Sequence, residues 1–243
     1  MRRILVSLLL LFSVVACGGE EKVSQRPLSN EEASLLSEVQ YQNYEIGGAD
    51  FSVSAAFLGM GETLSMTGFV DWKNHTGRAT VSAQGKESGI VEVLWNSNMV
   101  LEHHPVISKT LESMGSPGIK YVAREPDATN RLIDRAISII ISLASKEREN
   151  ALLIQQKEGS VFMRNDSLRQ KDVLVMRYGK VLRYWVDPAD IKLLRFEGDS
   201  SAGTAPIVVD LLAFGERKVE APTPQSIVAA DNIKELYDAS LAS

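Results

Sequence analysis

RYWVDPADIKLLRFEG (residues 183–198) and, after a short loop, APIVVDLLAFGE (residues 205–216) form the most strand-like part of the sequence. Their β-branched and aromatic residues fall into three runs, which an Asp-Pro pair and a Gly- and Ser-rich loop separate. Because side chains alternate across a strand, Val209 and Leu211 share a wholly apolar face of the third run. The segment predicts a three-stranded antiparallel meander whose sheet must be covered or must enclose something.

Two further regions show the period-two alternation that is typical of half-buried strands. Residues 49–101 contain about five such runs joined by tight turns, one of them at 59–61, and residues 161–178 contain two more. Residues 103–118 contain two prolines and several glycines and serines, which predicts a loop with at most one helical turn. We expect another short strand over residues 119–122.

Two amphipathic helices are predicted at the ends of the chain. Ser29 precedes Glu32 by three residues, a capping box that opens a helix, and Gly47-Gly48 ends that helix. Residues 222–243 contain a few spaced apolar side chains and predict a short terminal helix on the body.

The most apolar helix is expected between Asp127, its predicted N-cap, and Ala144. Few polar residues interrupt it, so the pattern predicts burial on most sides. A membrane-spanning segment is disfavoured, because Asp134 and Arg135 fall in the first turns and a charged run follows after too few apolar residues. The order of helix, strands, apolar helix and strands predicts an α+β fold with helices against one antiparallel sheet.

The N-terminus has the pattern of a bacterial lipoprotein signal. Two arginines precede a short apolar run, and Val-Val-Ala-Cys at 14–17 matches the lipobox. We therefore predict a signal peptide over residues 1–16, a diacylglycerol anchor on Cys17, a flexible tether over 17–28 and a single domain over 29–243. This anchor would hold the protein on the extracytoplasmic face of the cell membrane. The alternative is an ordinary secretory signal with an incidental buried thiol.

Charge and cysteine content narrow the possible partners. The chain carries 26 basic and 31 acidic residues, a formal charge of −5, and has no basic run. This argues against nucleic acid as a partner and against electrostatic docking to anionic lipid. Because Cys17 is the only cysteine, no disulfide can stabilise the fold, and the hydrophobic core must do so.

No motif predicts catalysis, a cofactor or a metal. The glycine-rich turns lack the spacing of a nucleotide-binding loop or a nucleophile elbow. The adjacent His103 and His104 would point to opposite faces of a strand, so a zinc site would need carboxylates from elsewhere. Asp187 and Asp190 flank a proline turn, where aspartate commonly binds its own backbone. We therefore expect no enzyme activity, no cofactor and no metal site.

Three segments are similar to the LolA/LppX/LprG-like group of envelope lipid-binding proteins. They are FVDW at 69–72, RYWVD at 183–187 with LRF at 194–196, and residues 208–215. The resemblance implies a strongly curved half-barrel with helices packed on its open side. It also implies a lipid carrier of the cell envelope.

The apolar helix and the two-sided apolar strands provide more hydrophobic surface than a small core requires. We therefore predict a cavity for a lipid or other amphiphile between the sheet and the helix, and an envelope or transporter protein as a further partner. The expected lining residues are Ile133, Ile137 and Ile140 on the helix and Val209 and Leu211 on the last strand. The alternative is a packed core in a non-catalytic structural or interaction lipoprotein.

Replacing Cys17 with serine removes the only sulfur that can carry the diacylglycerol. We expect the Cys17→Ser variant to remain an uncleaved precursor or to leave the membrane fraction. Detergent-phase partition and N-terminal analysis of the purified protein check this. Partition into the detergent phase with unchanged N-terminal processing would contradict lipidation at Cys17.

Overall fold

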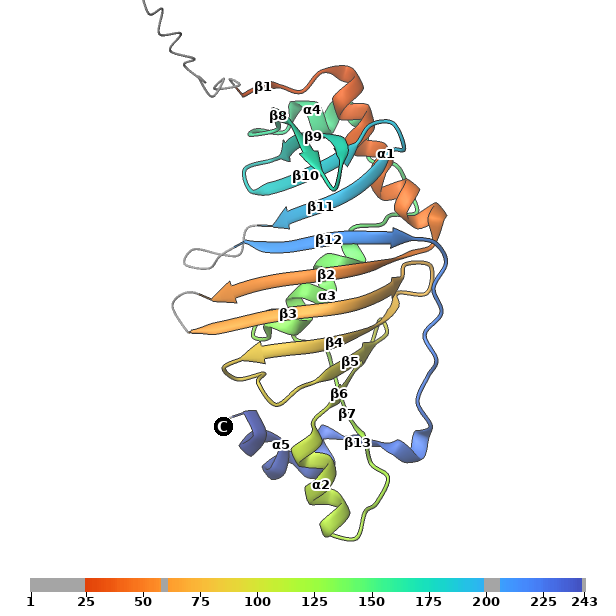
Figure 1. Ribbon diagram of the computed structural model, residues 1–243, viewed down its shortest axis with the longest axis vertical. Helices are drawn as coiled ribbons and strands as arrows, with labels where there is room; N and C mark the ends of the chain where they lie inside the picture. Colours follow the sequence, from red (N-terminus) through yellow and green to blue (C-terminus); the bar gives the residue numbers. More distant parts are fainter. Residues whose placement is uncertain (1–24, 58–60, 199–205, 242–243) are drawn as a thin grey trace, which may run out of the picture.

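The predicted meander forms three adjacent antiparallel strands: β10 (Leu182–Asp187), β11 (Lys192–Gly198) and β12 (Ile207–Phe214). The computed structural model describes residues 25–57, 61–198 and 206–241, and its strands form one 13-stranded sheet. Along the sheet the strands follow the order β1-β8-β9-β10-β11-β12-β2-β3-β4-β5-β6-β7-β13. The meander therefore joins the two other strand regions into a continuous sheet (Figure 1).

The other strands flank the meander on both sides. On one side lie β9 (Lys171–Tyr178), β8 (Val161–Leu168) and β1 (Arg26–Pro27). On the other lie β2 (Gly48–Phe57), β3 (Glu62–Asp71), β4 (Thr76–Gln84), β5 (Glu92–Trp95), β6 (Val100–His103), β7 (Tyr121–Arg124) and β13 (Ile227–Ala229). Neighbouring strands pair antiparallel, except that β13 runs parallel to β7. The sheet is strongly curved and stays open, with β1 and β13 as its two edges (Figure 1). The predicted α+β half-barrel is confirmed.

One row of apolar side chains crosses the concave face of the sheet from β8 to β4. Each residue of this row lies opposite the next across a strand pair, so all of them share one face. The row consists of Phe162, Met176, Tyr184, Phe196, Val209, Val53, Met66 and Val81. All eight are buried, so the concave face is covered from β8 to β4.

Two helices provide most of this cover. Helix α1 (Asn30–Ile46) begins at the predicted capping box, and Gly47 ends it in the left-handed region. It packs on β11 and on the short helix α4 (Ala151–Gln156) at one end of the sheet. Helix α3 (Leu132–Ser142) lies across the middle of the concave face, behind β2, β3 and β12 in Figure 1.

The prediction of a loop with at most one helical turn over residues 103–118 is wrong, because this segment contains the nine-residue helix α2 (Pro105–Ser113). Pro105 stands at the first helical position, where its fixed φ favours a helix and its missing N–H costs nothing. Ile107 and Leu111 pack against Tyr237 in the terminal helix α5 (Lys234–Leu241), far away in sequence. The segment is too short for its helical periodicity to be recognised in the sequence, and its packing partner Tyr237 is known only from the structure.

The start of α3 also differs from the prediction. Asp127 does not cap it, because the carboxylate of Asp127 accepts hydrogen bonds from the backbone and side chain of Asn130. The helix begins five residues later, after Arg131. Of the polar residues predicted on its surface, Asp134 is 2% exposed and is part of a buried ionic cluster.

The described chain begins inside the segment predicted as a tether. Arg26 and Pro27 pair with β8, and Leu28 is buried in the core, so these three residues belong to the folded body. The predicted signal peptide, Cys17 and most of the tether lie outside the described residues. Most of the predicted turn at 59–61 and the loop after β11 also lie outside them. Within the described part of the chain, no helix has both the length and the apolar character to cross a membrane.

The indole of Trp72 holds the C-terminal end of α3 against the sheet. Trp72 is 1% exposed, and its Nε1 donates to the carbonyl of Ile140 (2.9 Å). We expect Trp72→Phe to lose this bond, worth about 1 kcal/mol, in addition to some packing. Thermal unfolding checks this, because about 1 kcal/mol corresponds to roughly 2–4 °C in a domain of this size.

Trp95 provides the matched control for this measurement. It is also buried on the concave side, but its Nε1 has no hydrogen-bond partner among the described residues. We therefore expect Trp95→Phe to lower the melting temperature less than Trp72→Phe does. Equal losses would show that the bond to Ile140 contributes nothing.

Candidate functional site

The predicted cavity residues lie in two different environments. Ile133, Ile140, Val209 and Leu211 are fully buried in the main core, between α3 and the concave face. None of the four lines the groove that Ile137 borders. Ile137 alone lies at the wall of a groove. The structure therefore brings the five residues into one core, and Ile137, itself only 5% exposed, is the one of the five that also lines this groove.

This groove, which we call the α3 groove, runs between α3 and the turn that joins β5 to β6. Its volume is about 260 Å³. One wall comes from α3, and the other from the turn, the start of β6 and the loop before α3. Its lining combines apolar side chains (Val100, Pro126, Ala128, Ile137 and Ile141) with polar ones (Asn96, Ser97, Asp134 and Ser138).

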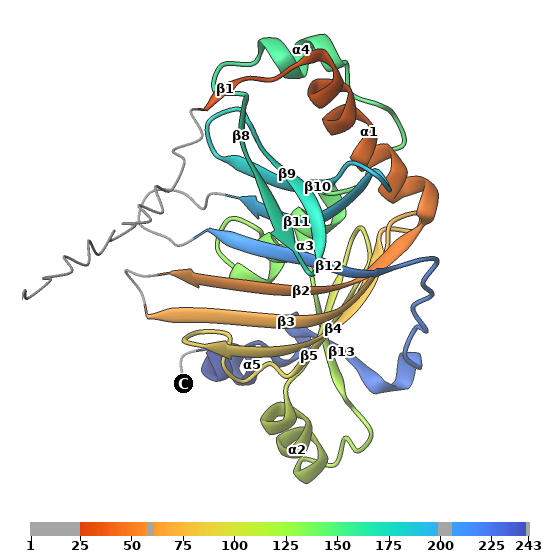
Figure 2. The same cartoon turned by 45° about the horizontal axis from the view of Figure 1, so that its top comes forward.

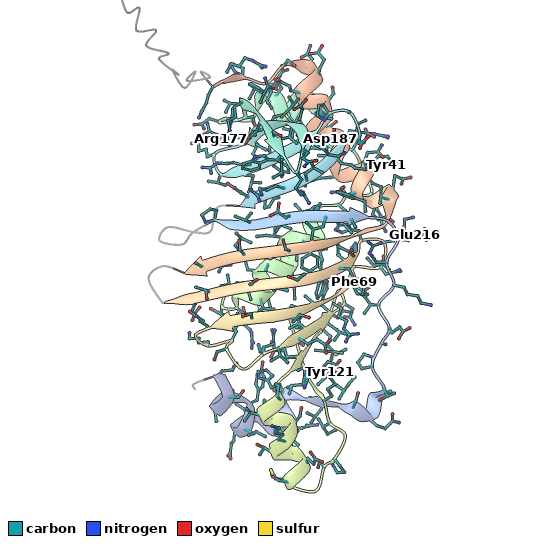
Figure 3. The ribbon with its side chains drawn as sticks, in the orientation of Figure 1. Tyr41, Phe69, Tyr121, Arg177, Asp187 and Glu216 are labelled. Carbon is teal, nitrogen blue, oxygen red and sulfur yellow. The ribbon has the colours of Figure 1, made fainter. Side chains whose placement is uncertain are left out.

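Two more hollows adjoin the same β5–β6 turn. One, of about 660 Å³, extends from Asn96 over Arg124 and Glu125 to residues 229–231. The other, of about 160 Å³, lies under the tail that leads from β12 to β13 and is mainly apolar. This tail runs from Glu216 to β13, which pairs with Tyr121 of β7 (Figure 3). The turn at residues 96–99 therefore lies where three surface hollows meet.

A buried ionic cluster adjoins the α3 groove through Asp134, which lines the groove. Glu102 of β6 is 0% exposed and accepts hydrogen bonds from Arg124 Nε (2.6 Å), Arg131 Nη2 (2.7 Å) and Tyr237 Oη (2.7 Å). Arg124 Nη2 also donates to Asp134 Oδ1 of α3 (2.7 Å). Glu102 therefore joins β6 to β7, to the segment before α3 and to α5, and Asp134 joins α3 to the same arginine of β7.

Two further residues complete the cluster. His104 Nε2 lies 3.1 Å from Glu102, while its Nδ1 is buried with no partner among the described residues. Glu87 accepts hydrogen bonds from the backbone N–H of Ile133 (3.1 Å) and from Arg131 Nε (3.2 Å). It therefore satisfies a free N–H group in the first turn of α3, where the N-cap residue Arg131 makes no side-chain capping bond. Three carboxylates thus share two guanidinium groups.

The surroundings of the two glutamates shift their pKa values in opposite directions. Burial alone would raise the pKa of Glu102, but the hydrogen bond from His104 and the charges of Arg124 and Arg131 lower it from 4.5 to about 2. Burial raises the pKa of Glu87, and Arg131 offsets this only in part. Glu102 is therefore held as a carboxylate, as a buried partner of two arginines must be.

The other candidates for chemistry have ordinary structural roles. The carboxylate of Asp187 accepts from the backbone N–H groups of Ala189 and Asp190, as predicted, and both aspartates bind Lys171. His103 stacks edge-on with Tyr121, whereas His104 meets Tyr237, so the two imidazoles lie in separate surroundings. Within the described ranges, no group of three or more His, Cys, Asp and Glu residues is placed to hold a metal ion.

The sequence predicted neither the ionic cluster nor the α3 groove. One signal was present: Asp134 interrupts an otherwise apolar helix, and a buried carboxylate requires a cationic partner. Its partner Arg124 is ten residues away, but Glu102 and Tyr237 are 135 residues apart and meet only through the fold. Nothing local in the sequence relates those two residues.

Comparisons with known proteins find similarity only among solved structures, since no family model and no curated protein matches the chain. An uncharacterized conserved protein from Thermus thermophilus is 11% identical, with a TM-score of 0.42 over 80% of this chain and 96% of that one. LprF from Mycobacterium bovis is 14% identical, with a TM-score of 0.49 over 82% and 99%. The MucA/MucB complex structure from Pseudomonas aeruginosa shows 9% identity and a TM-score of 0.34 over 81% and 59%. At these values the similarities establish no family for the chain.

Removing the charge of Glu102 should destabilise the protein strongly. Glu102→Gln leaves two buried arginines with less compensation, which typically costs about 3–5 kcal/mol, or roughly 6–20 °C in melting temperature. Because folding lowers the pKa of Glu102, its stabilising effect is complete above about pH 4.5 and is lost as the pH falls toward about 2. We therefore expect the melting temperature of the Glu102→Gln variant to lack this dependence on pH between about 4.5 and 2.

Glu158 provides a control with the same change in charge. Its ion pair with Lys180 (2.8 Å) is exposed on both sides, so Glu158→Gln should leave the melting temperature unchanged. A Glu102→Gln variant as stable as this control would contradict the role of the cluster.

Proposed function

We propose that this protein is a non-catalytic, lipid-anchored protein of the cell envelope that binds an acyl chain or similar amphiphile in the α3 groove. The observation that carries the proposal is the groove itself, whose lining combines apolar side chains with polar ones, among them Asp134 of the ionic cluster. An amphiphile needs this combination, because its tail must leave water while its headgroup keeps polar partners.

The apolar wall of the groove combines two buried core residues, Val100 and Ile137, with the half-buried Ile141. Ile137 and Ile141 lie one turn apart on α3, and Val100 of β6 lines the same groove. An acyl chain placed along α3 would contact all three. Asn96, Ser97 and Ser138 offer hydrogen-bonding groups near the opening, which suits a neutral or zwitterionic headgroup better than a strongly charged one.

The lipobox supports the location of this activity. Two acyl chains on Cys17 would hold the protein at a membrane without further contact, since each buried methylene contributes about 0.8 kcal/mol. A binding groove held at a lipid surface would then exchange amphiphiles with that surface. This anchoring rests on the sequence of residues 1–17.

A second candidate function is a structural or interaction module without a ligand. The observation that favours it is the tight cover of the concave face, where Ile133 and Ile140 are completely buried. Here the apolar helix simply completes the core, and the groove is an incidental surface feature.

A pair of tryptophan substitutions on α3 separates the two functions. Ser138 lines the groove and Ser142, one turn further, does not, although both are exposed. We expect Ser138→Trp to fill the groove and weaken the binding of a zwitterionic dansyl-labelled lysophosphatidylcholine by roughly tenfold, about 1.4 kcal/mol, without a large change in melting temperature. Fluorescence titration measures the binding, and native mass spectrometry shows whether lipid co-purifies.

The control Ser142→Trp should bind the probe as the unsubstituted protein does. Ile140→Trp, in the closed core, should instead cost about 1–3 kcal/mol by overpacking, or roughly 2–12 °C. Equal binding by the Ser138→Trp and Ser142→Trp variants, with no co-purifying lipid, would reject the groove as a ligand site and favour the interaction module.

A further inference from the structure

Two adjacent leucines of α4 are exposed at one end of the molecule. Leu152 and Leu153 are 60% and 61% exposed, whereas Ile154 is buried and fixes the helix to the core. Folding thus covers one side of α4 and leaves two large apolar side chains in solvent. Single exposed apolar residues are common on protein surfaces, but adjacent ones on a projecting helix mark a contact site more often.

A third exposed apolar side chain lies in a turn that contacts the segment following α4. Val181, in the turn between β9 and β10, is 45% exposed. This turn packs close to Gly159, which follows α4, and Lys180 pairs with Glu158 (2.8 Å). Arg177, just before the turn, donates to the carbonyl of Gly159 (3.0 Å; Figure 3). We call Leu152, Leu153 and Val181 the α4 patch.

The chain enters the fold at this same end. β1 lies beside α4, and Gln155 of α4 donates to the carbonyl of Leu28 just after β1 (2.9 Å; Figures 1 and 2). Only nine residue steps separate Cys17 from Arg26. Their full extension is about 32 Å at ~3.5 Å per residue, and a flexible coil of this length spans about 15–18 Å. An anchor on Cys17 therefore keeps the α4 end, rather than the α2 end, near the bilayer.

We propose that the α4 patch is a membrane-docking surface that inserts into the lipid bilayer holding the anchored protein. This inference rests on the lipid anchor of the proposed function. The charges around the patch are mixed, with Lys157 and Lys180 next to Glu158, so the contact depends on apolar insertion rather than on anionic lipid. Docking there fixes the orientation of the half-barrel, with α2 pointing away from the membrane (Figure 2).

The test uses the lipidated full-length protein in phosphatidylcholine vesicles. In Leu152→Cys, the new thiol is the only one free for labelling when Cys17 is lipidated, and an environment-sensitive fluorophore is attached to it. Val106→Cys is the control, because Val106 is 69% exposed on α2 at the opposite end. We expect nitroxide-labelled lipid to quench the probe at position 152 more than that at 106, on the order of threefold or more, with no dependence on salt.

A second experiment tests whether the dye itself, rather than the leucines, causes the insertion. The probe is placed at Val181→Cys, with or without Leu152→Ser and Leu153→Ser. Because both leucines are exposed, the serines should leave the melting temperature unchanged while quenching at position 181 falls severalfold.

The outcomes distinguish this inference from the proposed function. Equal quenching at positions 152 and 106 in a protein that partitions into detergent overturns membrane docking alone. Stronger quenching at position 106 would place the α2 end at the bilayer and overturn it as well. A protein that stays in the aqueous phase overturns the anchor and, with it, this inference. Loss of probe binding in the α3 groove has no bearing on these measurements.

Discussion

A strongly curved sheet with an apolar concave face cannot exist uncovered in water. The row of eight buried side chains from Phe162 to Val81 would otherwise expose one continuous hydrophobic surface. Helix α3 covers its middle, with Ile133 and Ile140 completely buried. The rest of the architecture depends on this contact, because the strands gain little from pairing unless their inner face is removed from water.

Directional bonds at both ends determine how α3 lies on this surface. Apolar contact alone would allow the helix to slide or rotate, since hydrophobic burial has no preferred direction. At the C-terminal end Trp72 donates to Ile140 and Asn43 donates to Leu143, both by buried side chains. At the N-terminal end Glu87 accepts from Ile133 and Arg124 binds Asp134. These bonds fix which face of α3 turns outward and so shape the α3 groove.

The ionic cluster performs a similar task at the open edge of the half-barrel. Buried ion pairs often contribute little net stability, but breaking one is costly, so they select one arrangement among several. Glu102 accepts from groups on β7, on the segment before α3 and on α5. The terminal segment, including the parallel pairing of β13 with β7, is thereby joined to the same edge. One end of the molecule is organised by charge and the other by the packing of α1, α4 and β1.

The sequence by itself determined the elements whose signals are local. The capping box at Ser29, the left-handed Gly47, the alternating strands and the meander from Leu182 to Phe214 need only neighbouring residues to be recognised. Tertiary structure alone decided the rest. Helix α2 is short and depends on Tyr237, Glu102 meets partners up to 135 residues away, and Ile137 faces a groove while Ile133 does not. Helical periodicity gives the apolar side of α3, but only its packed and hydrogen-bonded position on the sheet decides which of those isoleucines lines the groove.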